Sequence, residues 1–132
     1  MDEKAKKEII KSSIGDDGYL TPESEQKIKD RVKELLKEKK STKIYPVVVI
    51  GDTDLGEKEF YVGYFGQPTF PQFSKFIAAG KKDETVALKT LAKDTFIEGD
   101  KELVDSDSLF LFGAMPQIQA VMSVRHSYIV NL

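Results

Sequence analysis

Residues 43–65 read KIYPVVVIGDTDLGEKEFYVGYF. Two runs rich in β-branched and aromatic residues flank a connection of Gly, Asp and Thr, which is typical of a β-hairpin with a longer loop. Because proline cannot donate a ladder hydrogen bond, Pro46 predicts a first strand that lies at a sheet edge or begins after Pro46. Alternation along the second run predicts two faces, one with Phe60, Val62 and Tyr64 and the other with Tyr61 and Phe65.

Helical patterns lie on both sides of the hairpin. Before it, a helix is predicted over residues 21–40, with Thr21 as its N-cap and Pro22 at the first helical position. Its one narrow apolar stripe consists of Ile28, Val32, Leu35 and Leu36. After it, helices are predicted over residues 69–80 and 83–99. Their predicted caps are Thr69 and Asp83, and their predicted ends are Gly80 and Gly99.

A last helix begins near the capping cluster of residues 105–107. Its apolar phase continues unbroken across Pro116, so we favour one helix kinked at Pro116 over two separate helices. We therefore expect an α+β fold with an N-terminal helix, an antiparallel β-hairpin and a C-terminal bundle of about three helices. Residues 1–20 are expected to be a flexible N-terminal segment, and residues 21–132 a single α+β domain.

Composition excludes several classes of protein. The chain has no cysteine, so disulfides, thiol catalysis and Cys-based zinc sites are excluded. Its net charge of −2 argues against duplex nucleic acid as the main partner, because such binding needs a basic patch that displaces counterions. The N-terminus lacks the apolar core of a signal peptide, and no apolar run approaches the roughly 20 residues of a membrane helix. These features indicate a cytosolic protein.

The sequence offers no motif for catalysis or for a metal ion. A calcium-loop register placed on Gly18 lacks two carboxylate positions, including the final bidentate glutamate, so no metal or cofactor is predicted. The acidic run from Asp94 to Asp107 is interpreted as helix capping and a solvated turn. His126 is the single histidine and has no neighbour in sequence that would make it a base. We expect no catalytic residue and no enzymatic activity.

Aromatic side chains crowd the segment from residue 60 to residue 76. Packing between the hairpin and the helix that follows is the favoured interpretation. An exposed apolar patch for a protein partner is the next alternative. A surface for stacking nucleobases has less support, because the chain lacks an RNP-type pattern and has few basic residues nearby.

Residues 57–132 show an order of features that resembles a known family. EFYVGYFGQPTFPQF is a short aromatic strand followed by proline and a helix. DTFIEGDKELVDSDSLFLFG is a helix end, Gly-Asp, an acidic turn and a capped apolar helix. This order resembles the small tail-assembly-chaperone-like proteins of tailed phages and prophages, notably those of Bacteroidetes hosts.

The resemblance implies a non-enzymatic role in the cytoplasm of the bacterial host. Such proteins keep the long helical tape-measure protein soluble and help to recruit tube subunits around it. Adaptable Met and Phe side chains suit this role because they cover apolar stripes of varied sequence. The candidate partner-binding residues are Phe110, Phe112, Met115 and Met122. A structural component of the virion and a small nucleic-acid-associated regulator are the alternatives, and self-association remains open.

Overall fold

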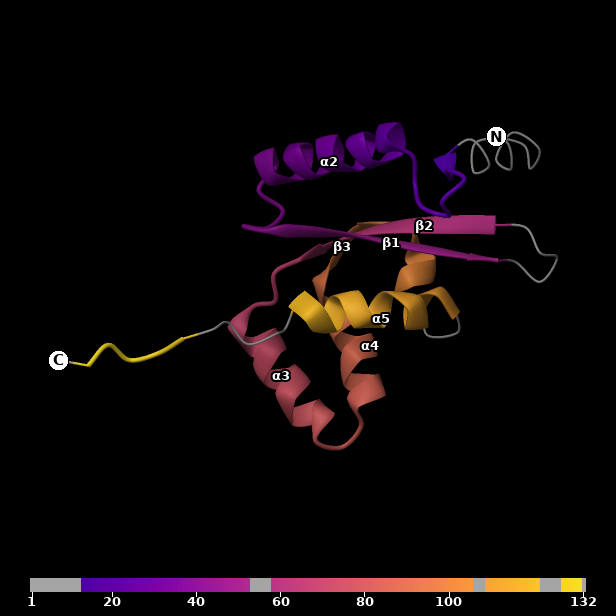
Figure 1. Ribbon diagram of the computed structural model, residues 1–132. Coiled ribbons are helices and arrows are strands. Elements are labelled where there is room, and N and C mark those ends of the chain that lie inside the picture. Colours follow the sequence, from indigo (N-terminus) through magenta and orange to yellow (C-terminus); the bar gives the residue numbers. More distant parts are fainter. Residues whose placement is uncertain (1–12, 53–57, 106–108, 122–126, 132) are drawn as a thin grey trace.

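The computed structural model describes residues 13–52, 58–105, 109–121 and 127–131. Helices and strands follow one another as an α+β chain, and the three C-terminal helices that we expected are present (Figure 1). The elements are α2 (Pro22–Lys37), β1 (Ile44–Asp52), β2 (Lys58–Gly66), α3 (Phe70–Gly80), α4 (Glu84–Thr95), β3 (Phe96–Gly99), the 3-10 turn η1 (Lys101–Leu103) and α5 (Leu109–Val121).

The sheet has three antiparallel strands in the order β1-β2-β3. The predicted hairpin is confirmed, with a register that runs from Ile44 opposite Gly66 to Asp52 opposite Lys58. β1 contains Pro46 and lies at an edge of the sheet, as one of the two predicted arrangements required. The edge position tolerates proline because an outward N–H has no ladder partner to lose.

The third strand was not predicted, because residues 96–99 were assigned to the end of a helix. The helix instead ends at Thr95, and the chain becomes extended at Phe96, with ψ 125°. Phe96 packs on one side of the sheet and Ile97 on the other, which is the alternation of a strand. Pairing of Gly63 with Gly99 brings β3 alongside β2. Gly99 has φ +122°, a conformation that a side chain disfavours.

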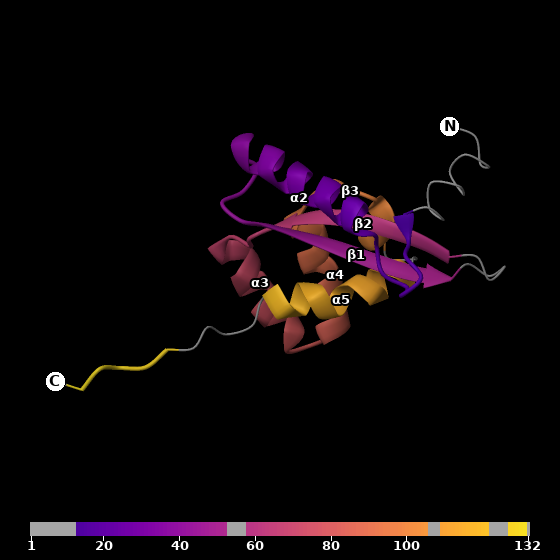
Figure 2. The ribbon, with the colours of Figure 1, turned by 45° about the horizontal axis from the view of Figure 1, so that its top comes forward.

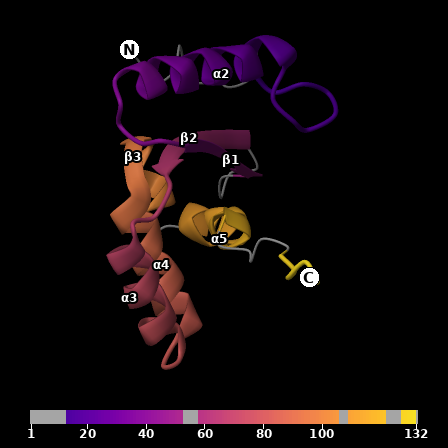
Figure 3. The same cartoon turned by 90° about the vertical axis from the view of Figure 1, so that its left-hand side faces the viewer.

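Helices cover both faces of the sheet. α2 lies on one face, whereas α4 and α5 lie on the other (Figures 1 and 3). Under α2, Leu35 is fully buried and packs with Ile44 and Tyr64. The opposite face carries the larger core, which is made of Val47, Phe65, Leu88, Leu91, Ala92, Leu103, Leu111, Ala114, Met115 and Ile118. Val62 and Tyr64 share the first face and Tyr61 and Phe65 the second, as predicted.

The predicted helix starts are confirmed at three caps. Thr21 Oγ1 accepts a hydrogen bond from the Ser24 N–H, and Asp83 Oδ1 accepts one from the Val86 N–H. Thr69 forms a reciprocal capping box with Gln72. Each cap satisfies a backbone donor that the first helical turn leaves without a partner.

α5 is one helix that contains Pro116, so the prediction of a single helix is confirmed. The predicted start of this helix, residues 106–107, lies outside the described residues. α5 packs against β1, and an added Cβ on Gly113 would lie 2.6 Å from Val49 Cγ1. A glycine at this position therefore lets the helix approach the strand closely.

The segment before α2 was expected to be flexible. Its residues 1–12 lie outside the part of the chain that the structure describes. Ile14 and Leu20 form an isolated antiparallel bridge, and Leu20 is buried. The loop between them is closed by the Tyr19 C=O, which accepts a hydrogen bond of 2.7 Å from the Gly15 N–H.

Candidate functional site

Three of the four residues that the sequence suggested for partner binding are described by the structure, and these three do not form one surface. Met115 is only 8% exposed and packs in the core with Leu111 and Ile118, so its side chain does not reach the surface. Phe110 is half-buried and packs edge-on against Tyr61, with ring centroids 4.5 Å apart. Phe112 is 49% exposed on the outer side of α5. Met122 lies outside the described residues.

α3 exposes three large apolar side chains, whereas Phe112 is the one that the described side chains of α5 expose. Phe70, Phe73 and Ile77 have exposed fractions of 82%, 37% and 45%. They are spaced at i, i+3 and i+7 and therefore lie along one side of the helix. With Ser74, Ala78 and Lys81 they line an open depression. We call Phe70, Phe73 and Ile77 the α3 apolar face.

The sequence favours packing of the aromatic side chains of residues 60–76 between the hairpin and the helix. Among the three phenylalanines of α3, Phe76 alone packs against the buried cluster. No residue of α3 is fully buried. The aromatic cluster therefore divides in two, because the strand residues Tyr64 and Phe65 are buried whereas Phe70 is almost fully exposed. The alternative of an exposed apolar patch describes α3 better than core packing does.

α3 is held in place on its inner side. It packs along α4, and the two helices descend together below the sheet (Figure 1). Gln72 Nε2 donates a hydrogen bond of 3.1 Å to the Asp94 C=O, and Lys75 Nζ lies 3.4 Å from Asp94 Oδ2. These contacts and the capping box fix the orientation in which the apolar face points outward. A fixed surface needs less ordering when a partner binds.

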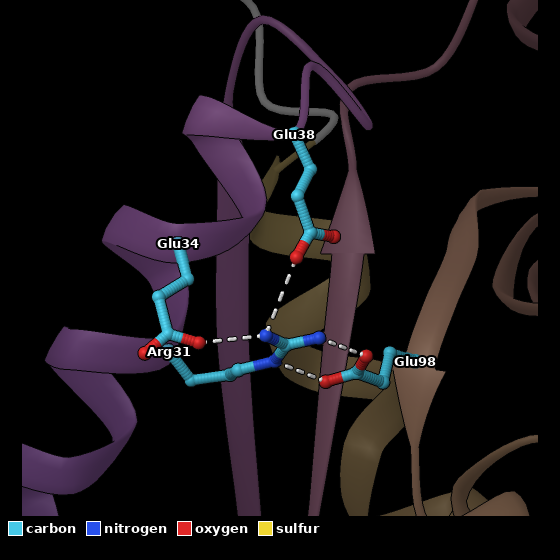
Figure 4. A network of polar contacts seen from close by, with 4 residues as sticks. All are labelled: Arg31, Glu34, Glu38 and Glu98. Atoms are coloured by element: carbon cyan, nitrogen blue, oxygen red, sulfur yellow. Dashed lines mark hydrogen bonds and ion pairs between the residues drawn. The ribbon is translucent and has the colours of Figure 1, made fainter.

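A polar network links α2 to β3 (Figure 4). Arg31 Nε and Nη2 donate to the two carboxylate oxygens of Glu98 at 2.6 and 2.5 Å. Arg31 Nη1 also lies 2.8 Å from Glu34 Oε2 and 3.6 Å from Glu38 Oε1. The hydrogen bonds that Arg31 donates to Glu98 and then to Glu34 raise the pKa of Arg31 above its usual range, and the bonds that Glu98 accepts from Arg31 lower the pKa of Glu98.

This network joins α2 to β3. It also engages both carboxylate oxygens of Glu98, so that neither is free for chemistry. The bidentate geometry uses both oxygens of Glu98, which is the arrangement that suits an arginine side chain. Two other members of the acidic run also have structural partners. Asp94 contacts α3, and Asp100 Oδ2 accepts a hydrogen bond of 2.8 Å from the Val62 N–H. Members of the acidic run therefore link separate elements of the fold. The sequence predicted only helix capping and a solvated turn for this run.

Tyr61 and Tyr64 on β2 also have shifted pKa values. Burial, followed by the hydrogen bond to Glu59, raises the pKa of Tyr61 to about 12. Burial is also the first cause that raises the pKa of Tyr64. Both tyrosines therefore stay protonated near neutral pH, and neither is suited to act as a base there.

Other classes of site find little support in the described part of the chain. No group of three or more His, Cys, Asp or Glu residues there could hold a metal ion. A small cavity lined by Val47, Phe65, Leu91 and Ile118 has a volume of about 10 Å³, which is room for one water molecule at most. His126 lies outside the described residues.

A search for a membrane-spanning helix and three comparisons with known proteins also bear on the function. Within the described ranges, the structure has no helix with the length and apolar character needed to cross a bilayer. Comparison with protein-family models, with curated proteins and with solved structures found no significant match in any of the three. The resemblance to tail-assembly chaperones therefore stays a prediction, and the α3 apolar face is the best-defined candidate for a binding site.

Proposed function

We propose that this chain is a non-enzymatic assembly protein that covers an apolar helical segment of a protein partner. The observation that carries the proposal is the α3 apolar face, which presents Phe70, Phe73 and Ile77 on a helix fixed from its inner side. Anchors at i, i+3 and i+7 are the pattern by which one helix packs along another. Covering exposed aromatic side chains releases the water around them and supplies the driving force.

The resemblance over residues 57–132 supplies the class of partner. The partner is a long helical protein of the tape-measure type, whose apolar stripe would otherwise remain exposed before the tail tube assembles around it. The surface chemistry agrees with this proposal, because the α3 apolar face is uncharged and Lys81 lies at its border. Exposed Phe112 on α5 adds a second apolar side chain that a long partner could contact.

Co-expression with the longest helical protein encoded beside its gene tests the proposal. The wild-type chain should keep that partner soluble, and the two should elute together. Phe70→Asp should reduce the affinity by roughly 30-fold, because losing an interface anchor costs about 2 kcal/mol or more. Soluble yield of the partner and the dissociation constant are the measurements.

Val86→Asp is the matched control. Val86 is also exposed and also lies in the first turn of a helix, where an acidic side chain suits the helix dipole. Both variants should therefore fold like the wild type by circular dichroism, and Val86→Asp should retain binding. If Phe70→Asp keeps the partner soluble as well as the wild type does, the α3 apolar face is not the site. If the wild type itself gives no rescue, the chaperone function is wrong, and purified particles should then be analysed for this chain as a virion component.

A further inference from the structure

The outer edge of β1 carries backbone groups that point away from the sheet. On β2, the Val62 N–H donates to Asp100 Oδ2 and the Val62 C=O accepts from the Asp100 N–H, both at 2.8 Å. Both polar groups of Val62 therefore point toward the β3 side. Val48 is opposite Val62 in the antiparallel register, so this pair is one of the pairs that do not exchange hydrogen bonds. The N–H and C=O of Val48 consequently point outward.

The direction of these groups alternates along a strand, so it is known for the whole of β1. Ile44, Pro46 and Ile50 have the same parity as Val48 and also direct their backbone groups outward. Pro46, which has no N–H, therefore faces the outer edge. The ladder between β1 and β2 loses no hydrogen bond at this position. No strand among the described residues pairs with this edge.

The edge has few of the features that usually prevent pairing with another chain, although the loop of residues 17–20 lies across an open depression from Val48 and Ile50. Edge strands are commonly protected by charged side chains, prolines, bulges or a short length. β1 is nine residues long, and its register with β2 has no bulge. Between Lys43 and Asp52 it carries no charged residue. Pro46 removes one outward donor, but the N–H groups of Ile44, Val48 and Ile50 remain.

The C-terminal segment, residues 127–131, has the properties of a strand that could pair with this edge. Residues 127–131, with the sequence SYIVN, extend away from the folded body without helix or strand structure (Figures 1 and 2). Ile129 and Val130 are 91% and 71% exposed. Side chains of this type favour β-sheets, and the segment carries no charge. A single extended segment has no ladder of its own and is not stable as a strand in water.

We propose that residues 127–131 of one copy add to the outer edge of β1 in a second copy. Five residues span roughly 16 Å, so they fit within the nine residues of the edge. The outward N–H and C=O groups of Val48 and Ile50 would form the ladder, while Ile129 and Val130 would fall on opposite faces of the enlarged sheet. Because the segment points away from its own sheet, the acceptor is a second copy. This inference goes beyond the proposed function and does not use the α3 apolar face.

Cysteine cross-linking tests the contact directly, because the chain has no cysteine of its own. One protein carries Ile129→Cys or Val130→Cys, and a second protein of different tag length carries Val48→Cys or Ile50→Cys. The two tail positions cover both faces of the added strand. Mixing the pairs under mild oxidation should give a cross-linked hetero-pair on a non-reducing gel, since directly opposite Cβ atoms lie about 5 Å apart.

Val86→Cys serves as the control for random collision, because Val86 is exposed on α4, away from the edge. Equal cross-linking of the tail to Val86→Cys and to the edge positions would overturn the proposal. A double variant with Ile129→Cys and Val48→Cys in one chain tests the alternative of docking on the same copy. If it closes within one chain at high dilution and the mixed proteins give no hetero-pair, the second-copy arrangement is wrong.

Truncation after residue 126 gives an independent measurement. The full chain should show an apparent mass by light scattering at least about twice that of the truncated chain. The truncated chain should retain its circular dichroism, because residues 127–131, which make up all but the last of the six removed residues, are exposed. Equal masses for the two chains would overturn the proposal.

Discussion

Neighbouring residues on α5 have opposite surroundings. Leu111 is fully buried in the larger core, whereas Phe112 is half-exposed. We expect Leu111→Ala to lower the free energy of unfolding by about 2–5 kcal/mol, because it removes buried methyl groups and leaves a cavity. Phe112→Ala should change it by less than about 0.5 kcal/mol. Urea unfolding of both variants checks the pair, and a similar loss for Phe112→Ala would show that its ring is packed.

The Arg31–Glu98 pair predicts a pH dependence with a definite sign. The pKa of Glu98 is lowered in the folded protein from an ordinary value of 4.5. A lowered folded-state pKa stabilises the protein above the unfolded-state pKa, and this stabilisation is lost as the pH falls through the folded-state value. Glu98→Gln should therefore lower the melting temperature at pH 7, and the difference from the wild type should narrow below pH 4.5.

Thermal melts of both proteins from neutral pH to pH 3 provide the measurement. Glu34→Gln is a suitable comparison, because Glu34 is more exposed and shares only one of the Arg31 contacts. At neutral pH, Glu34→Gln should lower the melting temperature less than Glu98→Gln does. The difference in melting temperature between Glu98→Gln and the wild type could instead stay constant down to pH 3. That result would show that the ion pair is not the source of the difference.

At the scale of elements, the packing of α5 on β1 depends on Gly113. An added Cβ there would lie 2.6 Å from Val49 Cγ1, so the helix would have to move off the strand. We expect Gly113→Ala to lower the free energy of unfolding by about 1–3 kcal/mol. Gly80→Ala is the control, since its Cβ would meet the nearest Cβ at an ordinary 4.0 Å. If both variants unfold at the same denaturant concentration, the close approach at Gly113 carries no energetic weight.

Elements fixed by local interactions were predictable from the sequence. The hairpin follows from its turn-rich connection. The helix starts follow from caps such as Thr69 and Asp83, whose side chains each accept a hydrogen bond from the N–H three residues later. β3 was missed because Phe96 lies four residues after Ala92 and so continues a helical phase. Its strand conformation depends on pairing with β2, which is more than thirty residues away in the sequence.

The candidate site shows the same limit for a different reason. Periodicity identifies which side chains share one side of a helix, but it does not say whether another element covers them. The Phe70 side of α3 and the Met115 side of α5 both read as apolar stripes. The sheet covers Met115, whereas among the described residues nothing buries Phe70. Only the tertiary arrangement separates a core face from a surface that is available to a partner.

For the whole molecule, two cores on opposite faces of one sheet predict how the protein unfolds. Ile44 belongs to the core under α2, and Ile118 belongs to the larger core. Ile44→Val and Ile118→Val should each lower the free energy of unfolding by about 0.5–1.5 kcal/mol. Their effects should add within about 0.5 kcal/mol, because the sheet separates the two sites.

Denaturant unfolding followed by far-ultraviolet circular dichroism and by tyrosine fluorescence measures this behaviour. Both probes should give one coincident transition, as expected when the shared sheet couples its two faces. A separate early transition in Ile44→Val alone would mean that α2 detaches from the sheet as an independent unit.

The Arg31–Glu98 pair joins residues that are 67 positions apart in the chain. During synthesis α2 leaves the ribosome first, but its salt-bridge partner on β3 follows much later. At about 5–20 residues per second, the ribosome needs roughly 3–13 s to add the intervening chain. The β1–β2 hairpin emerges within that interval, so α2 can cover its face of the hairpin early. The Arg31–Glu98 contact then locks α2 to the sheet only when β3 arrives, and α5, which is synthesised later still, completes the larger core on the other face.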